Sequence, residues 1–238
     1  MNKQEKIIEM FDEIAPTYDK ANRIMSFGVD ISWRKSACNQ VLERFLGGSV
    51  SIIDVACGTG DMMGIWAKTA EEKGVNIDTL IGVDPSEKML EVAKGKFPNF
   101  NFIKATATET TLASDCAEIL SISYGIRNVV DLESALLEFN RVLKNDGYLV
   151  VLEFTKPQKS GIISKMRDFY ISRILPKIGG AISKNREAYE YLPESIGNFL
   201  DSKNFTLALQ NAGFSVEVVQ GFSFDVSTLF IAKKVRKA

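Results

Sequence analysis

The stretch SIIDVACGTGDMMGIW, residues 51–66, decides the fold. An apolar run rich in β-branched residues ends at Asp54, and a turn of small residues containing Gly58, Thr59 and Gly60 follows directly. The run favours a buried strand, and the turn favours a connection from that strand to a helix over residues 61–73. Two interpretations fit the turn: a tight connection alone, or a place where a ligand approaches the backbone.

The same alternation continues on the C-terminal side. From residue 53 to 154, runs rich in Val, Ile and Leu alternate with amphipathic segments, which is typical of a parallel sheet with helices on both faces. Two later runs, 214–221 and 226–235, predict an antiparallel hairpin that closes the sheet edge. The expected fold is therefore α/β, Rossmann-like and mostly parallel. Its first five strands are expected at 51–56, 78–84, 100–105, 117–125 and 148–154.

The length and the helical segments indicate one domain. A chain of 238 residues with 45% hydrophobic and 25% charged residues can bury one sizeable core. We expect a single domain over 1–238, with N-terminal helices within 1–46 and a helical lid insertion at about 155–199. Helices are expected at 3–13, 32–45, 61–73, 131–143 and 201–212, and a further helix is expected to start at Pro85 and Ser86, with Ser86 as its cap.

Composition excludes several classes of protein. A net charge of -1 argues against a nucleic-acid partner. Three scattered cysteines form no C-x-x-C pair, and with no histidine in the chain we expect no metal site and no Ser-His-Asp triad. We find no signal-peptide pattern and no run of about 20 apolar residues, so a cytoplasmic location is expected, extending to the inner face of the cell membrane. The sequence leaves the oligomeric state open and is compatible with a homodimer.

The position of the glycine turn favours one class of ligand. In an open parallel sheet, ligands bind beyond the carboxyl ends of the strands, and this turn lies at such an end. Asp84 ends the next strand, 24 residues after Gly60, where a carboxylate can accept hydrogen bonds from both hydroxyls of a ribose. An adenosine-containing ligand is therefore expected there.

Spacing and charge distinguish two such ligands. A dinucleotide fingerprint reads G-x-G-x-x-G, whereas residues 58–64 read GTGDMMG, with the third glycine out of place. An anionic pyrophosphate would also lie beside Asp54 and Asp61, whereas the ammonium and sulfonium groups of S-adenosylmethionine are attracted by carboxylates. The pattern favours S-adenosylmethionine, and a nicotinamide-dependent dehydrogenase is the alternative.

Longer motifs resemble a known family. DVACGTGD resembles the first motif of the class I methyltransferases, whose sheet has seven strands. Four further segments resemble the ubiquinone/menaquinone biosynthesis C-methyltransferases, and the resemblance runs from about residue 5 to 234: YDKANRIMSFGVDISWR (18–34), SYGIRNV (123–129), RVLKNDGYLVVLEF (141–154) and YEYLPESI (189–196). The chain departs from the family pattern at Ala56, where glycine is usual, at Asp30, where histidine is common, and at Thr106, where Asn or Asp is frequent.

The resemblance implies a reaction and roles for particular residues. The reaction is methyl transfer from S-adenosylmethionine to a ring carbon of a prenylated hydroquinone, demethylmenaquinol above all. The alternatives are a benzoquinol of ubiquinone biosynthesis, another small-molecule acceptor, and a binding or regulatory protein that has lost activity. The implied donor-binding residues are Asp54, Gly58, Thr59, Gly60, Asp84, Thr106, Ala107 and Ser123, and the implied catalytic residues are Arg127, Asn128 and Tyr18.

Carbon methylation requires electron density on the ring, which loss of a phenolic proton supplies. Arg127 is expected to stabilise the phenolate, and the alternative is a structural arginine with nearby Asp131 as its partner. Tyr18 is expected to precede a polar turn and to guide the proton away, directly or through a water. Its unperturbed pKa of about 10 makes it a poor base without help. Tyr189, Tyr191 and Ser195 are expected to close over the quinol.

Residues 156–186 form a basic island, with eight Lys or Arg residues and one Asp. Apolar residues recur in it at helical spacing: Ile162, Ile163, Met166, Phe169, Tyr170 and Ile174. A basic amphipathic helix suits the surface of an anionic membrane, where a prenylated quinol resides. The alternative is a lid helix that packs its apolar face on the core and leaves its lysines in solvent.

Overall fold

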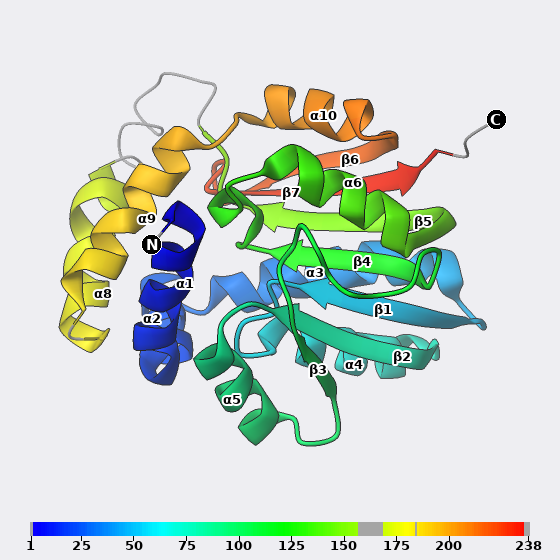
Figure 1. Ribbon diagram of the computed structural model, residues 1–238, viewed down its shortest axis with the longest axis horizontal. Coiled ribbons are helices and arrows are strands. Elements are labelled where there is room, and N and C mark those ends of the chain that lie inside the picture. The colour runs from blue at the N-terminus through cyan, green and yellow to red at the C-terminus, as the bar shows by residue number, and fades with distance from the viewer. Residues whose placement is uncertain (1, 157–168, 184, 236–238) are drawn as a thin grey trace.

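The computed structural model describes residues 2–156, 169–183 and 185–235. It contains a seven-stranded sheet in the order β3-β2-β1-β4-β5-β7-β6, with helices on both faces (Figure 1). The strands are β1 (Ser49–Val55), β2 (Asn76–Asp84), β3 (Asn101–Lys104), β4 (Ala117–Ser123), β5 (Leu143–Glu153), β6 (Phe214–Phe222) and β7 (Ser227–Lys234). The first five are parallel, and β7 runs antiparallel to β5 and β6. The predicted fold class is confirmed.

The helices bury two apolar clusters, one on each face of the sheet. Trp33 and Trp66 lie in the first cluster, and Phe139 and Phe205 lie in the second. The α-helices are α1 (Lys3–Ile14), α2 (Tyr18–Met25), α3 (Val29–Leu42), α4 (Asp61–Lys73), α5 (Glu87–Lys96), α6 (Leu132–Val142), α8 (Leu175–Ser183), α9 (Arg186–Asn198) and α10 (Ser202–Asn211). Ser86 caps α5 as predicted, because its side chain accepts a hydrogen bond from the backbone N–H of Met89.

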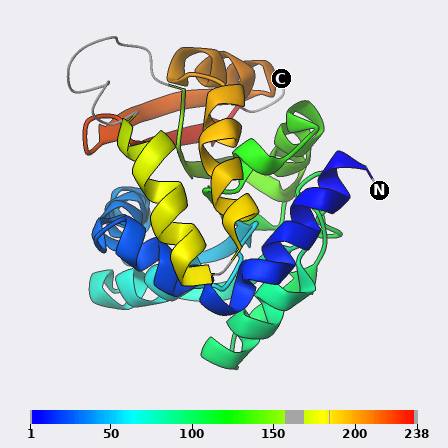
Figure 2. The same cartoon turned by 90° about the vertical axis from the view of Figure 1, so that its left-hand side faces the viewer.

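A third apolar cluster lies beyond the carboxyl ends of the strands. It contains Ile14 and Met25 from the N-terminal segment together with Leu175 and Tyr189 from the 155–199 region. Figure 2 shows α8 and α9 lying over this end of the sheet beside α1 and α2. The N-terminal segment and the inserted helices therefore form one helical layer over the edge where ligands are expected. None of the described helices is long and apolar enough to cross a bilayer.

Two local expectations were wrong. Tyr18 does not precede a turn: it begins α2, because Pro16 sits in a single 3-10 turn, Ala15–Thr17, that joins α1 to α2. The strand expected at 148–154 begins earlier, because β5 already starts at Leu143 and residues 145–147 lie inside it. Ala117 pairs with Leu143 but Ile119 pairs with Tyr148, so the additional residues of β5 bulge out of the ladder.

Asp54 is held in the interior between two strands and a helix. Its Oδ1 accepts a hydrogen bond of 2.6 Å from Oγ of Ser121 on β4, and that oxygen accepts one of 2.9 Å from the Trp66 indole on α4. Burial raises the pKa of Asp54 to about 7, although the Ser121 hydrogen bond and the Arg34 charge oppose the shift. The carboxyl group therefore tolerates burial best in its protonated form.

Gly82 on β2 tests how tightly the first cluster is packed. A Cβ at this position would lie 2.6 Å from Sδ of Met63 and 2.8 Å from Sγ of Cys57. We expect Gly82→Ala to lower the free energy of unfolding by about 1–3 kcal/mol, because overpacking forces side chains out of their rotamers. Gly95→Ala, at an exposed position of α5, is the control, since its Cβ would meet nothing within 4 Å and alanine favours a helix. Equal unfolding midpoints in urea for the two variants would contradict this packing.

Asp54 generates a pH-dependent prediction. A raised pKa in the folded state means that the native protein binds more protons than the unfolded chain between pH 4 and 7. The stabilisation is therefore complete below about pH 4 and is lost as the pH rises to about 7, by up to about 4 kcal/mol. We expect Asp54→Asn to flatten much of this slope, measured by urea unfolding across that range. Asp78→Asn, at an exposed position of β2, should leave the slope intact.

Candidate functional site

Two adjoining cavities lie at the carboxyl ends of the strands. The turn cavity, of about 120 Å³, lies beside the glycine turn, and the lid cavity, of about 240 Å³, lies beneath α8 and α9. Phe11, Tyr18 and Tyr124 line both. The predicted site residues that line the turn cavity are Gly58, Asp84, Thr106, Ala107, Ser123, Asn128 and Tyr18, and those that line the lid cavity are Tyr18 and Arg127.

Asp84 links the glycine turn to the next helix. Its Oδ2 accepts a hydrogen bond of 2.8 Å from the backbone N–H of Gly58, and its Oδ1 accepts one of 2.8 Å from that of Ser86. Burial raises the pKa of Asp84 to about 6, although these two hydrogen bonds oppose the shift. Each carboxylate oxygen keeps a further lone pair, so the group can also accept from two hydroxyls of a ligand.

Two buried oxygens of the turn cavity lack partners. Oγ of Ser123, at the end of β4, and Oδ1 of Asn128 form no hydrogen bond within the described part of the chain. Leaving such atoms unsatisfied costs about 1–3 kcal/mol each. A positively charged ligand group beside electron-rich oxygens would offset that cost. With Asp84, these atoms make the turn cavity fit a ligand that combines a ribose with a cationic centre.

Three predicted donor-binding residues do not line the cavities. Asp54 lies behind the turn, in the network with Ser121. The Thr59 hydroxyl donates to Asp19 on α2 at 2.5 Å, which ties the turn to the N-terminal helices. Gly60 adopts φ +83°, and a Cβ there would lie 3.0 Å from the Phe97 ring. The structure thus places all three as supports of the turn.

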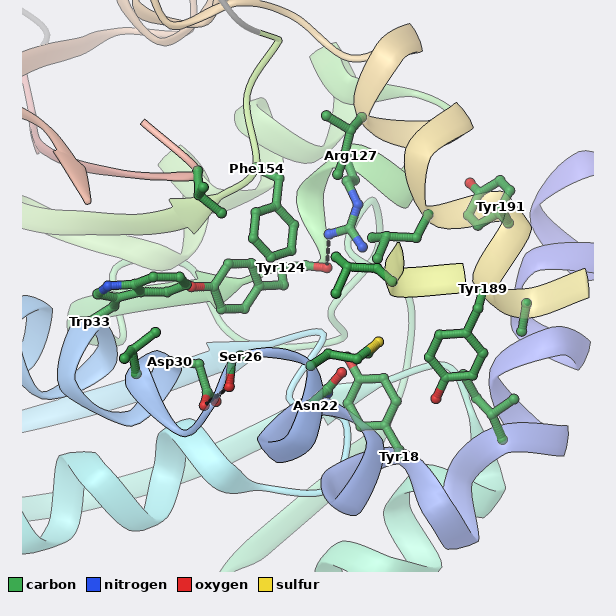
Figure 3. Close-up of a pocket in the computed structure, with 18 of the residues that line it drawn as sticks. Tyr18, Asn22, Ser26, Asp30, Trp33, Tyr124, Arg127, Phe154, Tyr189 and Tyr191 are labelled. Carbon is green, nitrogen blue, oxygen red and sulfur yellow. Dashed lines mark hydrogen bonds between the residues drawn. The ribbon is translucent and has the colours of Figure 1, made fainter. Parts of the chain in front are cut away.

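The lid cavity is mostly apolar and has cationic groups around it. Figure 3 shows Arg127 and Tyr18 approaching it from opposite sides, with Tyr189 and Tyr191 on the side of α9. Both tyrosines line it as expected. Ser195 does not: its hydroxyl accepts a hydrogen bond of 3.3 Å from Nε of Arg127. The α9 helix therefore both closes the cavity and positions the arginine.

Arg127 is fixed by Glu153, and the expectation of Asp131 as its partner was wrong. Nη1 of Arg127 donates to Oε1 of Glu153 at 2.7 Å and to the Tyr124 carbonyl at 2.5 Å. Asp131 instead caps α6 through the backbone N–H of Ser134. Burial raises the pKa of Glu153, and the Arg127 charge opposes that shift. Because these bonds use Nε and Nη1, Nη2 is the nitrogen through which Arg127 can contact a ligand.

Tyr18 lies at the junction of the two cavities. Burial raises the pKa of its hydroxyl, while the Arg127 charge and a hydrogen bond with Asn22 oppose the shift. At neutral pH the phenol is therefore protonated. Tyr18 is suited to donate a hydrogen bond to an anionic oxygen between the cavities, and its raised pKa leaves less phenolate to act as a base than in free tyrosine.

Sequence reasoning missed part of the site. Asp30 lines the lid cavity and pairs with Arg34 and Arg23. Burial alone would raise the pKa of Asp30, but a hydrogen bond from Ser26 and the two arginines together lower it. Tyr124 stacks on Phe154 with ring centroids 4.6 Å apart. Two features of the sequence could have indicated these contacts. One is the four-residue spacing of Asp30 and Arg34, and the other is the single acidic residue, Glu153, at the end of the apolar run 148–153.

Comparison with known proteins identifies the family. The model of the ubiE/COQ5 methyltransferase family matches residues 1–234. The ubiquinone/menaquinone biosynthesis C-methyltransferase UbiE of Campylobacter jejuni (strain NCTC 11168) is 60% identical over 235 residues, which cover 99% of this chain and all of that protein. The demethylmenaquinone methyltransferase of Chlorobaculum tepidum is 36% identical over 229 residues, covering 96% of this chain and 92% of that protein.

Solved structures agree on the fold. A SAM-dependent methyltransferase from Thermotoga maritima superposes with a TM-score of 0.62 at 21% identity, covering 96% of this chain and 99% of that one. One from Aquifex aeolicus gives 0.58 at 18% identity, covering 83% and 89%. The seven-stranded sheet of a class I methyltransferase is thereby confirmed. Together with the family match, the predicted activity, carbon methylation with S-adenosylmethionine as donor, is confirmed, and this chain belongs to the ubiE/COQ5 methyltransferase family.

Proposed function

We propose that this protein transfers the methyl group of S-adenosylmethionine to a ring carbon of a prenylated hydroquinone, demethylmenaquinol above all. The observation that carries the proposal is the pair of cavities that meet at Tyr18 and Tyr124. One suits a cationic nucleoside and the other an apolar ring with a phenolic oxygen. The names of the similar proteins from Campylobacter jejuni and Chlorobaculum tepidum support the same acceptor class.

The donor is assigned to the turn cavity. When bound, S-adenosylmethionine supplies an electrophilic methyl group on a positively charged sulfur. Asp84 would hold the ribose, Thr106 and Ala107 would flank the adenine, and the oxygens of Ser123 and Asn128 would lie near the positive charge. Asp54, Thr59 and Gly60 would act on the donor through the shape of the turn.

The acceptor ring is assigned to the lid cavity. Arg127 favours loss of the phenolic proton, because its charge stabilises the phenolate in a mostly apolar cavity. The protonated Tyr18 would hold the oxygen at the junction or pass the proton to a water. Alignment of the ring carbon with the donor methyl then lowers the barrier, since reactants held in line have already lost their translational and rotational freedom.

Peripheral membrane contact through residues 156–186, at the cytoplasmic face, also remains a proposal. Arg173 and Lys177 are exposed and could meet anionic headgroups, but Lys159, Ile162, Ile163, Lys165, Met166 and Arg167 lie outside the described residues. The Tyr170 hydroxyl donates to the Met25 carbonyl at 2.8 Å, and Leu175 packs in the third cluster. These contacts support the lid interpretation, which is compatible with reversible membrane contact.

The acceptor class is tested by incubating the protein with methyl-labelled donor and a panel of reduced naphthoquinols and benzoquinols with short tails. We expect label in the naphthoquinols that lack the ring methyl group. Transfer to benzoquinols alone would place the protein in the ubiquinone branch. No transfer to any quinol would reject the proposed acceptor class.

The donor assignment predicts a loss of affinity in Asp84→Ala. Removing the acceptor of two ribose hydrogen bonds should weaken binding of S-adenosylmethionine and of its demethylated product by about 30- to 1000-fold, or roughly 2–4 kcal/mol. Calorimetry measures both affinities. Asp78→Ala, at the exposed beginning of the same strand, is the matched control and should bind normally. Unchanged affinity for the donor in a folded Asp84→Ala protein would contradict the assignment of Asp84 to the ribose.

The acceptor assignment predicts slow chemistry without the Arg127 charge. Arg127→Ala alone would leave the buried Glu153 without its ion-pair partner. We therefore prefer the double variant Arg127→Gln with Glu153→Gln, which removes both charges. We expect kcat to fall at least about 100-fold, as for loss of one group that stabilises an oxyanion, with donor affinity within about threefold of wild type. Glu153→Gln alone retains the arginine and serves as the control. Normal turnover in the double variant would mean that Arg127 is structural.

A further inference from the structure

Two turns at the mouth of the lid cavity each present an exposed phenylalanine. Phe27, between α2 and α3, is 80% exposed, and Phe224, between β6 and β7, is 74% exposed. Phe27 itself lines the cavity, as do Ser223 and Val226 on either side of Phe224. We call residues 24–31 the helical lip and residues 222–226 the hairpin lip.

Both lips hold their phenylalanines in a strained backbone conformation. Phe27 has φ +52°, and Ser223, Phe224 and Asp225 have φ +47°, +60° and +62°. Bulky residues rarely adopt this left-handed region, and such strain persists where the surrounding structure enforces it, often at functional sites. Each turn therefore keeps a strained backbone conformation that places a large apolar side chain at the surface.

The helical lip is braced from inside. The Ser26 hydroxyl accepts a hydrogen bond of 3.1 Å from the backbone N–H of Gly28 and donates one of 2.7 Å to Asp30. Asp30 in turn pairs with Arg23 and with Arg34. The exposed position of Phe27 is therefore built into the fold.

The lips also concentrate the exposed apolar surface. Ile24, Val29 and Ile31 in the helical lip are 42%, 41% and 43% exposed. With the two phenylalanines, five of the twelve large apolar residues exposed in the described ranges belong to the two lips. A concentration of apolar side chains at one place on a surface marks contact with an apolar partner.

The size of the cavity indicates which partner that is. At about 240 Å³ the lid cavity can take a ring system, whereas a tail of many isoprene units needs space beyond it. The tail must then leave through the mouth. A water-insoluble tail that passes between two apolar lips requires an apolar phase outside them.

We infer that the two lips insert into the lipid bilayer and form the passage through which the quinol ring enters while its tail stays among the lipids. This inference rests on the proposed function, since it requires a prenylated substrate. It differs from contact through the basic segment 156–186, because apolar insertion needs no anionic headgroups and withstands salt that screens charges.

A triple variant separates tail handling from chemistry. We choose Ile24→Ser, Ile31→Ser and Phe224→Ser, which are exposed and do not line the cavity. The matched control is Leu46→Ser, Leu137→Ser and Leu207→Ser, which removes three exposed apolar side chains elsewhere. With a long-tailed quinol in phosphatidylcholine vesicles, we expect at least tenfold slower methylation for the lip variant only. With a short-tailed quinol in water, all three proteins should agree within about twofold.

Insertion itself is measured with tryptophan. The native Trp33 and Trp66 are buried, so Ile31→Trp and Phe224→Trp report on the lips, and Leu137→Trp is the control. In phosphatidylcholine vesicles at high salt, we expect a blue shift and quenching by lipids brominated in the acyl chain for the lip positions only.

Three outcomes would overturn the inference. The first is a lack of quenching at the lip tryptophans, and the second is a lip variant that methylates the long-tailed quinol at the wild-type rate. The third is a wild-type protein that is a dimer, a lip variant that is a monomer, and no quenching in either case, which would assign the lips to contact with a second copy of the chain. Failure of the wild type to methylate the short-tailed quinol would instead reject the proposed function.

Discussion

The parallel pairing of β1 with both β2 and β4 is the constraint on which the rest of the structure depends. Parallel neighbours cannot be joined by tight hairpins, so each connection crosses the sheet through a helix and returns the chain in the same direction. All the strand ends that bear functional groups therefore meet at one edge. The Asp84 carboxylate makes that edge rigid, because it accepts hydrogen bonds from the Gly58 turn after β1 and from Ser86 before α5.

The buried arginines at this edge are each paired with a carboxylate. Arg127 pairs with Glu153, and Arg34 pairs with Asp30, so each guanidinium beside the lid cavity has a carboxylate. Removing one partner of such a pair leaves a buried charge, which is far more costly than exchanging both. Within the described residues no cation forms an ion pair with Asp54 or Asp84, and burial raises their pKa values to about 7 and about 6. A cationic donor beside them would favour their ionised forms, so binding and ionisation are expected to support each other.

The helical layer gives the open sheet edge its two compartments. A Cβ on Gly179 of α8 would lie 2.1 Å from the Tyr189 ring of α9, so glycine permits the close approach of the two helices that cover the lid cavity. Tyr18, at the start of α2, separates this compartment from the turn cavity. Since the chain has no histidine, we propose that Tyr18, Arg127 and water handle the proton, which suits a reaction driven by alignment and by a reactive donor.

The sequence by itself determined the mostly parallel α/β core, its antiparallel ending and the family, because these rest on local periodicity and short motifs. It placed Gly58, Ser123 and Arg127 at the correct edge for the same reason. The tertiary structure alone decided that Asp54, Thr59 and Gly60 support the turn, that Glu153 and not Asp131 holds Arg127, and that Tyr18 begins a helix between two cavities. Such pairings join residues far apart in the chain, and their geometry depends on how the helical layer packs, which no local pattern encodes.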